Sequence, residues 1–415
     1  MIKTGKWIVY RFPVFFLRTG KESAILYAMS RKKAVVRKPK IKKKTDYYDY
    51  SLLAVIILLT CFGLVMLYST SSYMAELNYG DDMYYFKKQA AISLACIIAA
   101  LAISKIDYHI LTRFTGVIYG VAAVLMLLVK TPLGRSANGA RRWLNLGPLS
   151  FQPSELAKIA VIVCLSYMIV NMGRKIGTLK GFMMLAGSGG ALAFITYVFT
   201  DNLSTAIIIF GITIGLIFIA HPKVRPFLIA AGILLVVAIV AISFLSATME
   251  TSSSFRLRRI LVWLHPEDYA SGDGYQTIQA LYAIGSGGFL GRGLGNSIQK
   301  LGSVPEAQND MIFSIVCEEL GILGGMIVLL LFAYLLYRLF FIAQNAPDLF
   351  GSLIVTGIFI HIALQVILNI AVVLNLMPNT GVTLPFISYG GTSIVFLMSE
   401  MAIALSVARQ IKFQE

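Results

Sequence analysis

Asp310 lies at the junction between a glycine-rich, basic loop and a long apolar segment. The stretch 284–325 reads IGSGGFLGRGLGNSIQKLGSVPEAQNDMIFSIVCEELGILGG, so the polar part ends at the aspartate itself. A carboxylate where a loop enters hydrocarbon is costly to keep, which makes it a functional candidate by default. The chemistry that such a group offers is proton abstraction as a general base.

A structural explanation of Asp310 competes with this one. Aspartate is a favoured helix N-cap, and an apolar helix is expected to begin just after it. Small and polar residues nevertheless continue the line of Asp310 along one helical face, which favours a cavity over a simple cap. They are Ser314, Cys317, Glu318, Gly321 and Gly325.

Cationic residues gather in two loops, 130–158 and 247–311, and the second of these contains Asp310. They are Lys130, Arg135, Arg141, Arg142, Lys158, Arg256, Arg258, Arg259, Arg292 and Lys300. Arginine matches phosphate oxygens well, so an anionic ligand such as a lipid-linked pyrophosphate is one interpretation. Nonspecific contact with lipid headgroups is the other, and the residues leave both open. Lys158 and Glu155 are three apart and can pair on one helix face, and phosphate contact by Lys158 is the alternative. Glu306, in the same loop as Asp310, is a candidate substrate-binding residue or is simply solvent-exposed.

The elements that must position these residues are membrane helices. The chain of 415 residues is 57% apolar and only 13% charged, with mean hydropathy +0.77. The composition predicts an all-α integral membrane protein with about ten transmembrane helices. The expected spans are 51–68, 90–104, 110–129, 156–171, 182–199, 203–220, 226–245, 312–340, 351–376 and 388–411. A large extracytoplasmic loop, about 247–311, separates the seventh from the eighth.

The division of the chain follows its charge. Residues 1–49 hold 14 of the 36 Lys and Arg against three acids, while 50–411 form the membrane domain. An even number of spans and this basic tail place both termini in the cytoplasm, and the tail favours anionic lipid over nucleic acid. Translation could begin at Met1 or at Met29. No cleavable signal peptide is apparent.

Motifs of soluble enzymes are lacking in the sequence. The four His residues are dispersed, the four Cys fall in apolar segments, and no metal cluster is evident. The string GFLGRGLG at 288–295 has no strand beside it, which argues against a dinucleotide site. Its glycines favour tight turns beside a ligand.

Three long strings carry a resemblance to a known family. NGARRWLNLGPLSFQPSELAK (138–158), GSGGFLGRGLGNSIQKLGSVPEAQND (285–310) and MPNTGVTLPFISYGGTS (377–393) resemble the SEDS family of FtsW, RodA and SpoVE proteins. The match extends over about residues 45–411. QKLG–VPEAQND together with LPFISYGGTS looks most like the FtsW and SpoVE branch.

The resemblance implies a peptidoglycan glycosyltransferase that polymerises glycan strands from lipid II. The family's catalytic aspartate falls on Asp310, and its basic loop residue falls on Arg142, next to Trp143. The transfer would invert the anomeric carbon and release undecaprenyl pyrophosphate, so no enzymic nucleophile is needed. Arg141, Arg142 and Arg292 would bind the pyrophosphate, with or without a divalent cation (Mg or Mn). Ser150 and Gly302 stand where some members carry a charged residue, so these positions receive no role.

The resemblance also implies partners and a location. The partners would be a class B penicillin-binding transpeptidase and other divisome membrane proteins, at the division septum of a bacterial plasma membrane, with the active site extracytoplasmic. The rivals are a lipid II flippase or other transporter, a scaffold without enzyme activity, and the elongation or sporulation paralogue. A transporter would place its site near the midplane, in broken helices of paired halves. No internal repeat is visible here.

Overall fold

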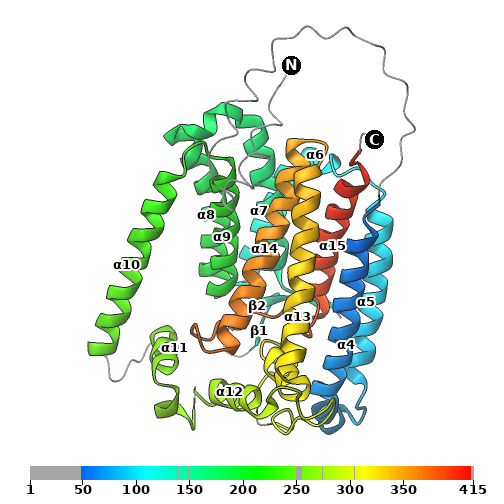
Figure 1. The fold of residues 1–415 in the computed structure, drawn as a ribbon. Coiled ribbons are helices and arrows are strands. Elements are labelled where there is room, and N and C mark those ends of the chain that lie inside the picture. The colour runs from blue at the N-terminus through cyan, green and yellow to red at the C-terminus, as the bar shows by residue number, and fades with distance from the viewer. Residues whose placement is uncertain are drawn as a thin grey trace, which may run out of the picture.

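The computed structural model describes residues 48–412, apart from 138–139, 147–148, 249–254, 273 and 303. The basic tail up to residue 47, and with it the choice between Met1 and Met29, lies outside the described residues. The described chain forms a bundle of long helices that carries a small sheet and short helices at one end (Figure 1).

Most of the expected spans are found close to their expected bounds. In the part of the chain that the structure describes, nine helices are long and apolar enough to cross a membrane. They are α4 (Tyr50–Tyr79), α5 (Tyr84–Ile103), α6 (Ile110–Leu128), α7 (Pro153–Met172), α8 (Leu179–Phe199), α9 (Leu203–Ala220), α13 (Ile312–Asn345), α14 (Leu349–Val373) and α15 (Gly391–Arg409). The expected seventh span falls on α10 (Arg225–Thr248), whose 24 residues also suffice for a crossing. The predicted helical membrane fold is therefore confirmed, although a small sheet accompanies the helices.

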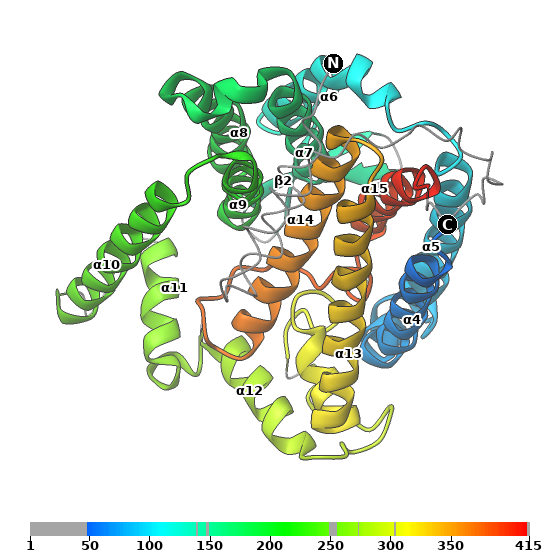
Figure 2. The same cartoon turned by 45° about the horizontal axis from the view of Figure 1, so that its top comes forward.

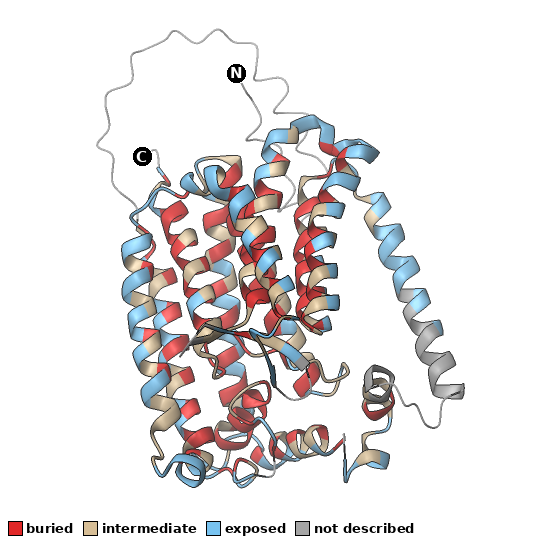
Figure 3. Cartoon of the chain, turned by 180° about the vertical axis from the view of Figure 1, so that it is seen from behind, coloured by how far each residue is buried: buried red, intermediate tan, exposed pale blue. Residues whose placement is uncertain are grey.

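The spans differ in how far the protein itself encloses them. In α14 and α15, 61% of the apolar window is buried, against 17% in α5 and α6. Helix α14 packs against α7, α9, α13 and α15, and it lies near the middle of the bundle in Figure 2. Buried residues accordingly gather on inward helix faces (Figure 3). Polar side chains on α14 are thereby kept from lipid.

Close helix packing at the centre depends on a small residue. A Cβ on Gly357 of α14 would stand 2.7 Å from Ile162 Cγ2 of α7. Helices in membranes associate through such small residues because their backbones must approach closely. The glycine therefore lets α7 and α14 present their polar groups to each other.

Helix α10 behaves differently from the other long helices. In Figures 1 and 2 it leans away from the bundle. Its side chains Leu228, Ile229 and Ile233 are about 60% exposed. An apolar helix in that position is suited to contact lipid rather than protein.

Both ends of the described chain lie at one end of the bundle. Arg338 near the end of α13 pairs with Asp49 at the start of α4, at 2.7 Å. Gln410, just beyond α15, donates to Asp107 in the α5–α6 loop at 2.9 Å. We call this the terminal end and the opposite one the loop end.

The loop end holds more regular structure than the sequence predicted. A three-stranded antiparallel sheet joins α6 to α7: β1 (Gly134–Ala137), β2 (Ala140–Leu146) and β3 (Leu149–Phe151), in that order. The expected long loop after α10 contains α11 (Phe255–Leu264), the 3-10 helix η3 (Pro266–Tyr269) and α12 (Tyr275–Gly287). These short elements carry many of the loop cations.

Candidate active site

Asp310 is a buried carboxylate at the loop end of the bundle. Asp310 is only 8% exposed, and its main-chain carbonyl accepts a hydrogen bond from Asn369 of α14. The Asn369 Nδ2 donates at 2.7 Å both to the Asp310 carbonyl and to the Val382 carbonyl. The cap position of α13 is Met311, and the start of the helix has no side-chain cap. The capping explanation of Asp310 is therefore wrong.

The electrostatic surroundings of Asp310 suit a base. Burial raises the pKa of its carboxyl to about 7, and the nearby Glu306 charge acts in the same direction. The residue's own backbone amide and the Arg259 guanidinium oppose this rise. A carboxyl with a pKa near the working pH is a stronger base than an ordinary aspartate and is still ionised often enough to act.

A second loop, residues 377–390, closes around the aspartate. Ser388 Oγ donates to the Asn309 carbonyl at 2.6 Å, and the Tyr389 amide donates to the Gln308 carbonyl at 2.9 Å. Gly381 lies so near that a Cβ there would be 3.8 Å from Asp310 Oδ2. Segments about 70 residues apart in the sequence thus form one site.

Arg142 faces the same region from strand β2. Its Nη2 donates to the Asp201 carbonyl at 3.3 Å, whereas its Nε is buried without a partner among the described residues. Burial and the positive charge of Arg259 lower the pKa of this guanidinium, although Asp201 opposes the shift. Two arginines close enough to repel each other form an environment that an anion would stabilise.

Arg259 is a site residue that the sequence did not single out. It lies on α11, donates from Nη1 to the Asn379 carbonyl at 3.1 Å, and acts electrostatically on both Asp310 and Arg142. The sequence feature that pointed toward Arg259 was the cluster of Arg256, Arg258 and Arg259 in the long loop. That cluster alone could not tell which arginine faces the aspartate.

Arg141 and Trp143 lie beside Arg142 in β2 but on the other face of the strand, since successive side chains alternate. Arg141 is opposite Ser136 and Trp143 is opposite Arg135 in the pairing with β1. Arg141 is exposed, and Trp143 is half-buried.

Lys158 is fully enclosed in the bundle near the start of α7. Its Nζ is 3.0 Å from Glu155 Oε1 and 3.2 Å from Gln365 Oε1. The i, i+3 pairing with Glu155 is therefore present, and the lysine is only 2% exposed.

Arg292 and Glu306 are both on exposed parts of the loop. Arg292 Nη1 is 3.6 Å from Glu318 of α13, and its main chain donates to the Glu318 carbonyl at 3.0 Å. Glu306 accepts from the Asn309 side chain. Arg292 thus fixes the glycine-rich loop to α13, whereas Glu306 contributes charge near Asp310.

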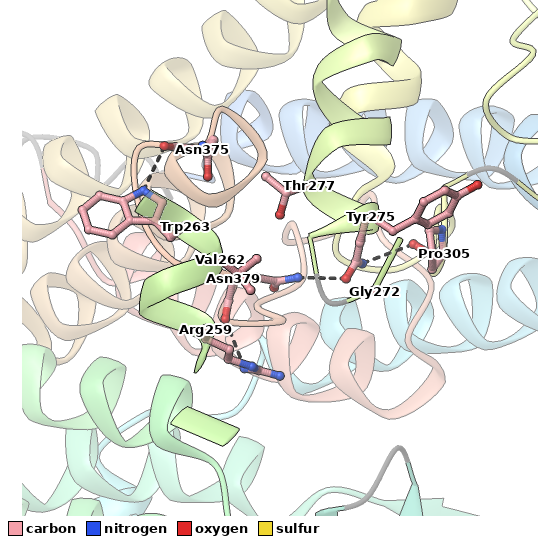
Figure 4. A pocket seen from close by; sticks show the side chains of 10 residues that line it. Arg259, Val262, Trp263, Gly272, Tyr275, Thr277, Pro305, Asn375 and Asn379 are labelled. Carbon is pink, nitrogen blue, oxygen red and sulfur yellow. Dashed lines mark hydrogen bonds between the residues drawn. The ribbon is translucent and has the colours of Figure 1, made fainter. Parts of the chain in front are cut away.

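A cavity of about 260 Å³ lies at the loop end of the bundle, with Arg259 in its wall (Figure 4). Its walls come from α11, α12 and the 375–379 loop, with Arg259, Trp263, Gln276 and Thr277 among the lining side chains. Trp263 Nε1 donates to the Asn375 carbonyl at 3.0 Å, and Asn379 Nδ2 donates to Gln276 Oε1 at 2.8 Å. An indole and several amides around one polar hollow suit a neutral, hydroxyl-rich ligand. Arg259 lines this cavity, and its positive charge also acts on the carboxyl of Asp310.

The fold and the site define the class of multi-spanning membrane proteins, here with a buried carboxyl and two neighbouring arginines at one end of the bundle. Comparison with known proteins gives the family. Residues 49–413 match the FtsW/RodA/SpoVE family model, described as cell cycle protein. The chain belongs to this family.

Relatives and solved structures agree with that assignment. Stage V sporulation protein E of Bacillus subtilis is 36% identical, covering 89% of this chain and 99% of its own. A probable peptidoglycan glycosyltransferase FtsW of Trichlorobacter lovleyi is 35% identical, covering 91% and 97%. The name of the second relative agrees with the enzyme class that the resemblance implies.

Two solved structures share the fold at 25% sequence identity. A peptidoglycan synthase complex, described as coordinating polymerization and crosslinking, superposes with TM-score 0.72 over 87% of this chain and 98% of its own. The rod shape determining protein RodA of Thermus thermophilus gives 0.63 over 89% and 98%.

Proposed function

We propose that this protein polymerises peptidoglycan glycan strands from lipid II. The observation that carries the proposal is Asp310, a buried carboxyl whose pKa is raised to about 7 and which faces a cationic region. Sugar polymerisation needs such a base, and the anionic leaving group needs such cations. Relatives named as peptidoglycan glycosyltransferases support the same conclusion.

The proposed reaction is a single displacement. Asp310 takes the proton from the acceptor's 4-hydroxyl while that oxygen attacks the anomeric carbon of the donor. The bond from that carbon to the pyrophosphate oxygen breaks, and undecaprenyl pyrophosphate leaves. An α-linked donor gives a β-1,4 product in one inversion, so the enzyme needs no nucleophile.

Arg142 and Arg259 are the proposed clamp for the pyrophosphate. The buried Nε of Arg142 offers a donor without a partner among the described residues, and a phosphate oxygen would satisfy it. The anion would also relieve the repulsion between the two guanidinium groups. The cavity beside Arg259 would hold a sugar ring, with the Trp263 indole and the amides as its surface.

A divalent cation is a further part of the proposal. Mg²⁺ in phosphate sites is held by one or two carboxylates together with the phosphates. No group of three His, Cys, Asp or Glu side chains converges within the described ranges. We propose that any Mg or Mn enters with the pyrophosphate, with Glu306 as the nearby carboxylate, while Asp310 stays free to act as the base.

The setting of the reaction follows from topology and family. The basic tail favours cytoplasmic termini, so the terminal end would face the cytoplasm and the loop end the outside. We further propose a class B penicillin-binding transpeptidase and divisome proteins as partners, acting at the septum. A fluorescent fusion that labels the lateral wall or the forespore instead would favour the elongation or sporulation role.

The test is glycan synthesis from purified lipid II by the purified protein, with and without its cognate transpeptidase. Wild-type protein is expected to make long strands, whereas the Asp310→Asn variant makes none and still binds the transpeptidase. The rival, a lipid II flippase, predicts lipid II translocation in proteoliposomes without polymer. Polymerisation by the Asp310→Asn variant at the wild-type rate would remove Asp310 from its proposed role.

A further inference from the structure

Helix α14 carries a stripe of polar side chains from the middle of the membrane domain to the active site. His361, Gln365 and Asn369 are four residues apart, so they lie on one helical face. Each is at most 2% exposed. Polar residues so deep in a membrane domain are expected to be functional, yet the proposed reaction uses none of them directly.

Each residue of the stripe binds a different part of the molecule. His361 Nδ1 lies 2.8 and 2.9 Å from the two carboxylate oxygens of Glu400 on α15. Gln365 bonds to Lys158 of α7 and to Thr383. Asn369 bonds to the main chain of Asp310 and of Val382. The stripe thus ends on the main chain of both active-site loops.

The contacts of Gln365 determine the orientation of its amide group. Nε2 donates to the Thr383 carbonyl at 3.0 Å, and Oε1 accepts from Lys158 Nζ at 3.2 Å. In the flipped orientation the amide NH₂ would face the ammonium group, and the amide oxygen would face a carbonyl oxygen. Neither contact could form a hydrogen bond. The oxygen of Gln365 therefore faces His361, whose Nε2 is 2.8 Å away.

This orientation decides where the histidine carries a proton. An amide oxygen only accepts, so His361 Nε2 must donate. The Nδ1–Glu400 contact then requires a proton as well, because a bare nitrogen and an ionised carboxylate would repel each other. Either the ring is an imidazolium facing a carboxylate, or a neutral ring accepts from a protonated Glu400. In both forms the pair is neutral overall and holds one shared proton.

We propose that His361 and Glu400 form a proton-holding pair that positions the active site through Gln365. The shared proton keeps Nε2 a donor, and that hydrogen bond holds Gln365 against Lys158 and Thr383. Residue 383 in turn belongs to the loop that closes over Asp310. His361, Glu400 and Gln365 are thus positioning residues, since they touch no reacting atom. The other charged groups that reach this network are Lys158 and its partner Glu155.

Two variants of Glu400 distinguish a role of its hydrogen bond to His361 from a role of its side-chain volume alone. This test rests on the proposed polymerase function. Glu400→Gln keeps the shape and can donate to or accept from Nδ1, so kcat is expected to stay within about twofold of wild type. Glu400→Leu removes the partner, and we expect kcat to fall at least about tenfold while KM for lipid II changes less than about twofold. Thr356→Val, a buried change on α14 away from the stripe, is the matched control. Equal kcat for the Leu and Gln variants would overturn the proposal.

Two readouts do not depend on polymerase activity. In ¹⁵N-histidine NMR of wild-type protein, with His361 assigned from the His361→Asn variant, Nε2 is expected to carry a proton. A bare Nε2 overturns the inference. In hydrogen exchange, Glu400→Leu is expected to speed exchange in residues 381–389 and Glu400→Gln is not, while unchanged exchange in both contradicts the positioning role. If wild-type protein makes no glycan, the proposed function is overturned. The NMR and hydrogen-exchange measurements would still test the His361–Glu400 pair.

Discussion

The side-chain amide of Asn369 joins two loops by donating to the carbonyls of Asp310 and Val382, at 2.7 Å each. One residue from the interior of α14 therefore fixes the main chain of the candidate base and of the loop that covers it. Precise placement of catalytic groups depends on such support, because a displacement of about 1 Å can cost on the order of 10²-fold in rate.

The raised pKa of Asp310 predicts a pH-dependent rate. The base must be ionised, so polymerisation should increase about tenfold per pH unit below about 7 and level off above it. The measurement is initial rate against pH at saturating lipid II. A flat profile between about pH 5.5 and 8.5 would contradict this assignment.

The same pKa predicts a stability difference between wild type and the Asp310→Asn variant. The folded-state pKa exceeds the ordinary 3.8, so burial favours the neutral acid and ionisation destabilises the fold. Wild type should lose up to about 4 kcal/mol as the pH rises from about 4 through 7, whereas the variant should not. Thermal unfolding in detergent should therefore give similar midpoints at pH 4.5 and a higher midpoint for the variant at pH 8. Parallel behaviour across that range would argue against a buried, protonated Asp310.

Arg142→Ala is expected to weaken use of the lipid II donor. Loss of a charge-assisted hydrogen bond is worth about 1.5–3 kcal/mol, or roughly 10- to 100-fold in the lipid II concentration dependence. Arg174→Ala, an equal truncation of an exposed arginine at the terminal end, is the control. An unchanged KM for lipid II in the Arg142 variant would remove this residue from the pyrophosphate site.

Lys158→Met should destabilise the membrane domain because it leaves Glu155 buried without its cation. Removing one partner of a buried pair typically costs about 3–5 kcal/mol. Adding Glu155→Gln should recover part of that loss, and a double-mutant cycle in thermal unfolding measures the coupling. Lys175→Met on the exposed surface is the control. Purely additive effects would show that the 3.0 Å contact contributes nothing.

Gly321→Ala should disrupt the contact between α13 and the glycine-rich loop. The residue adopts φ +67°, and a Cβ would collide with the main chain of Gly291 and Phe289. Strain and overpacking together predict a loss of about 2–6 kcal/mol. Gly116→Ala, whose Cβ would meet nothing within 4 Å, should leave the melting temperature nearly unchanged. Equal melting temperatures for the two variants would refute this.

The membrane helices were largely predictable from the sequence because hydrocarbon imposes a local requirement. About 20 apolar residues must form a helix wherever they cross, so composition alone located the spans, from Tyr50 of α4 to Arg409 of α15. The loop end was less predictable, since the strands around Arg142 and the helix carrying Arg259 are stabilised by contacts between distant segments. The composition of a loop carries no local signal of this kind, because it does not reveal which distant segments the loop will contact.

The sequence by itself determined the membrane class, the family resemblance and the choice of Asp310 as candidate base. These follow from residue types and spacing within single stretches. Only the tertiary structure excluded helix capping for Asp310, brought Arg259 close enough to act electrostatically on it and placed Lys158 against Gln365. It alone also joined His361 to Glu400, whose partnership depends on α14 and α15 packing side by side. Hydrogen bonds and pKa values depend on three-dimensional neighbours, and helix packing decides those neighbours.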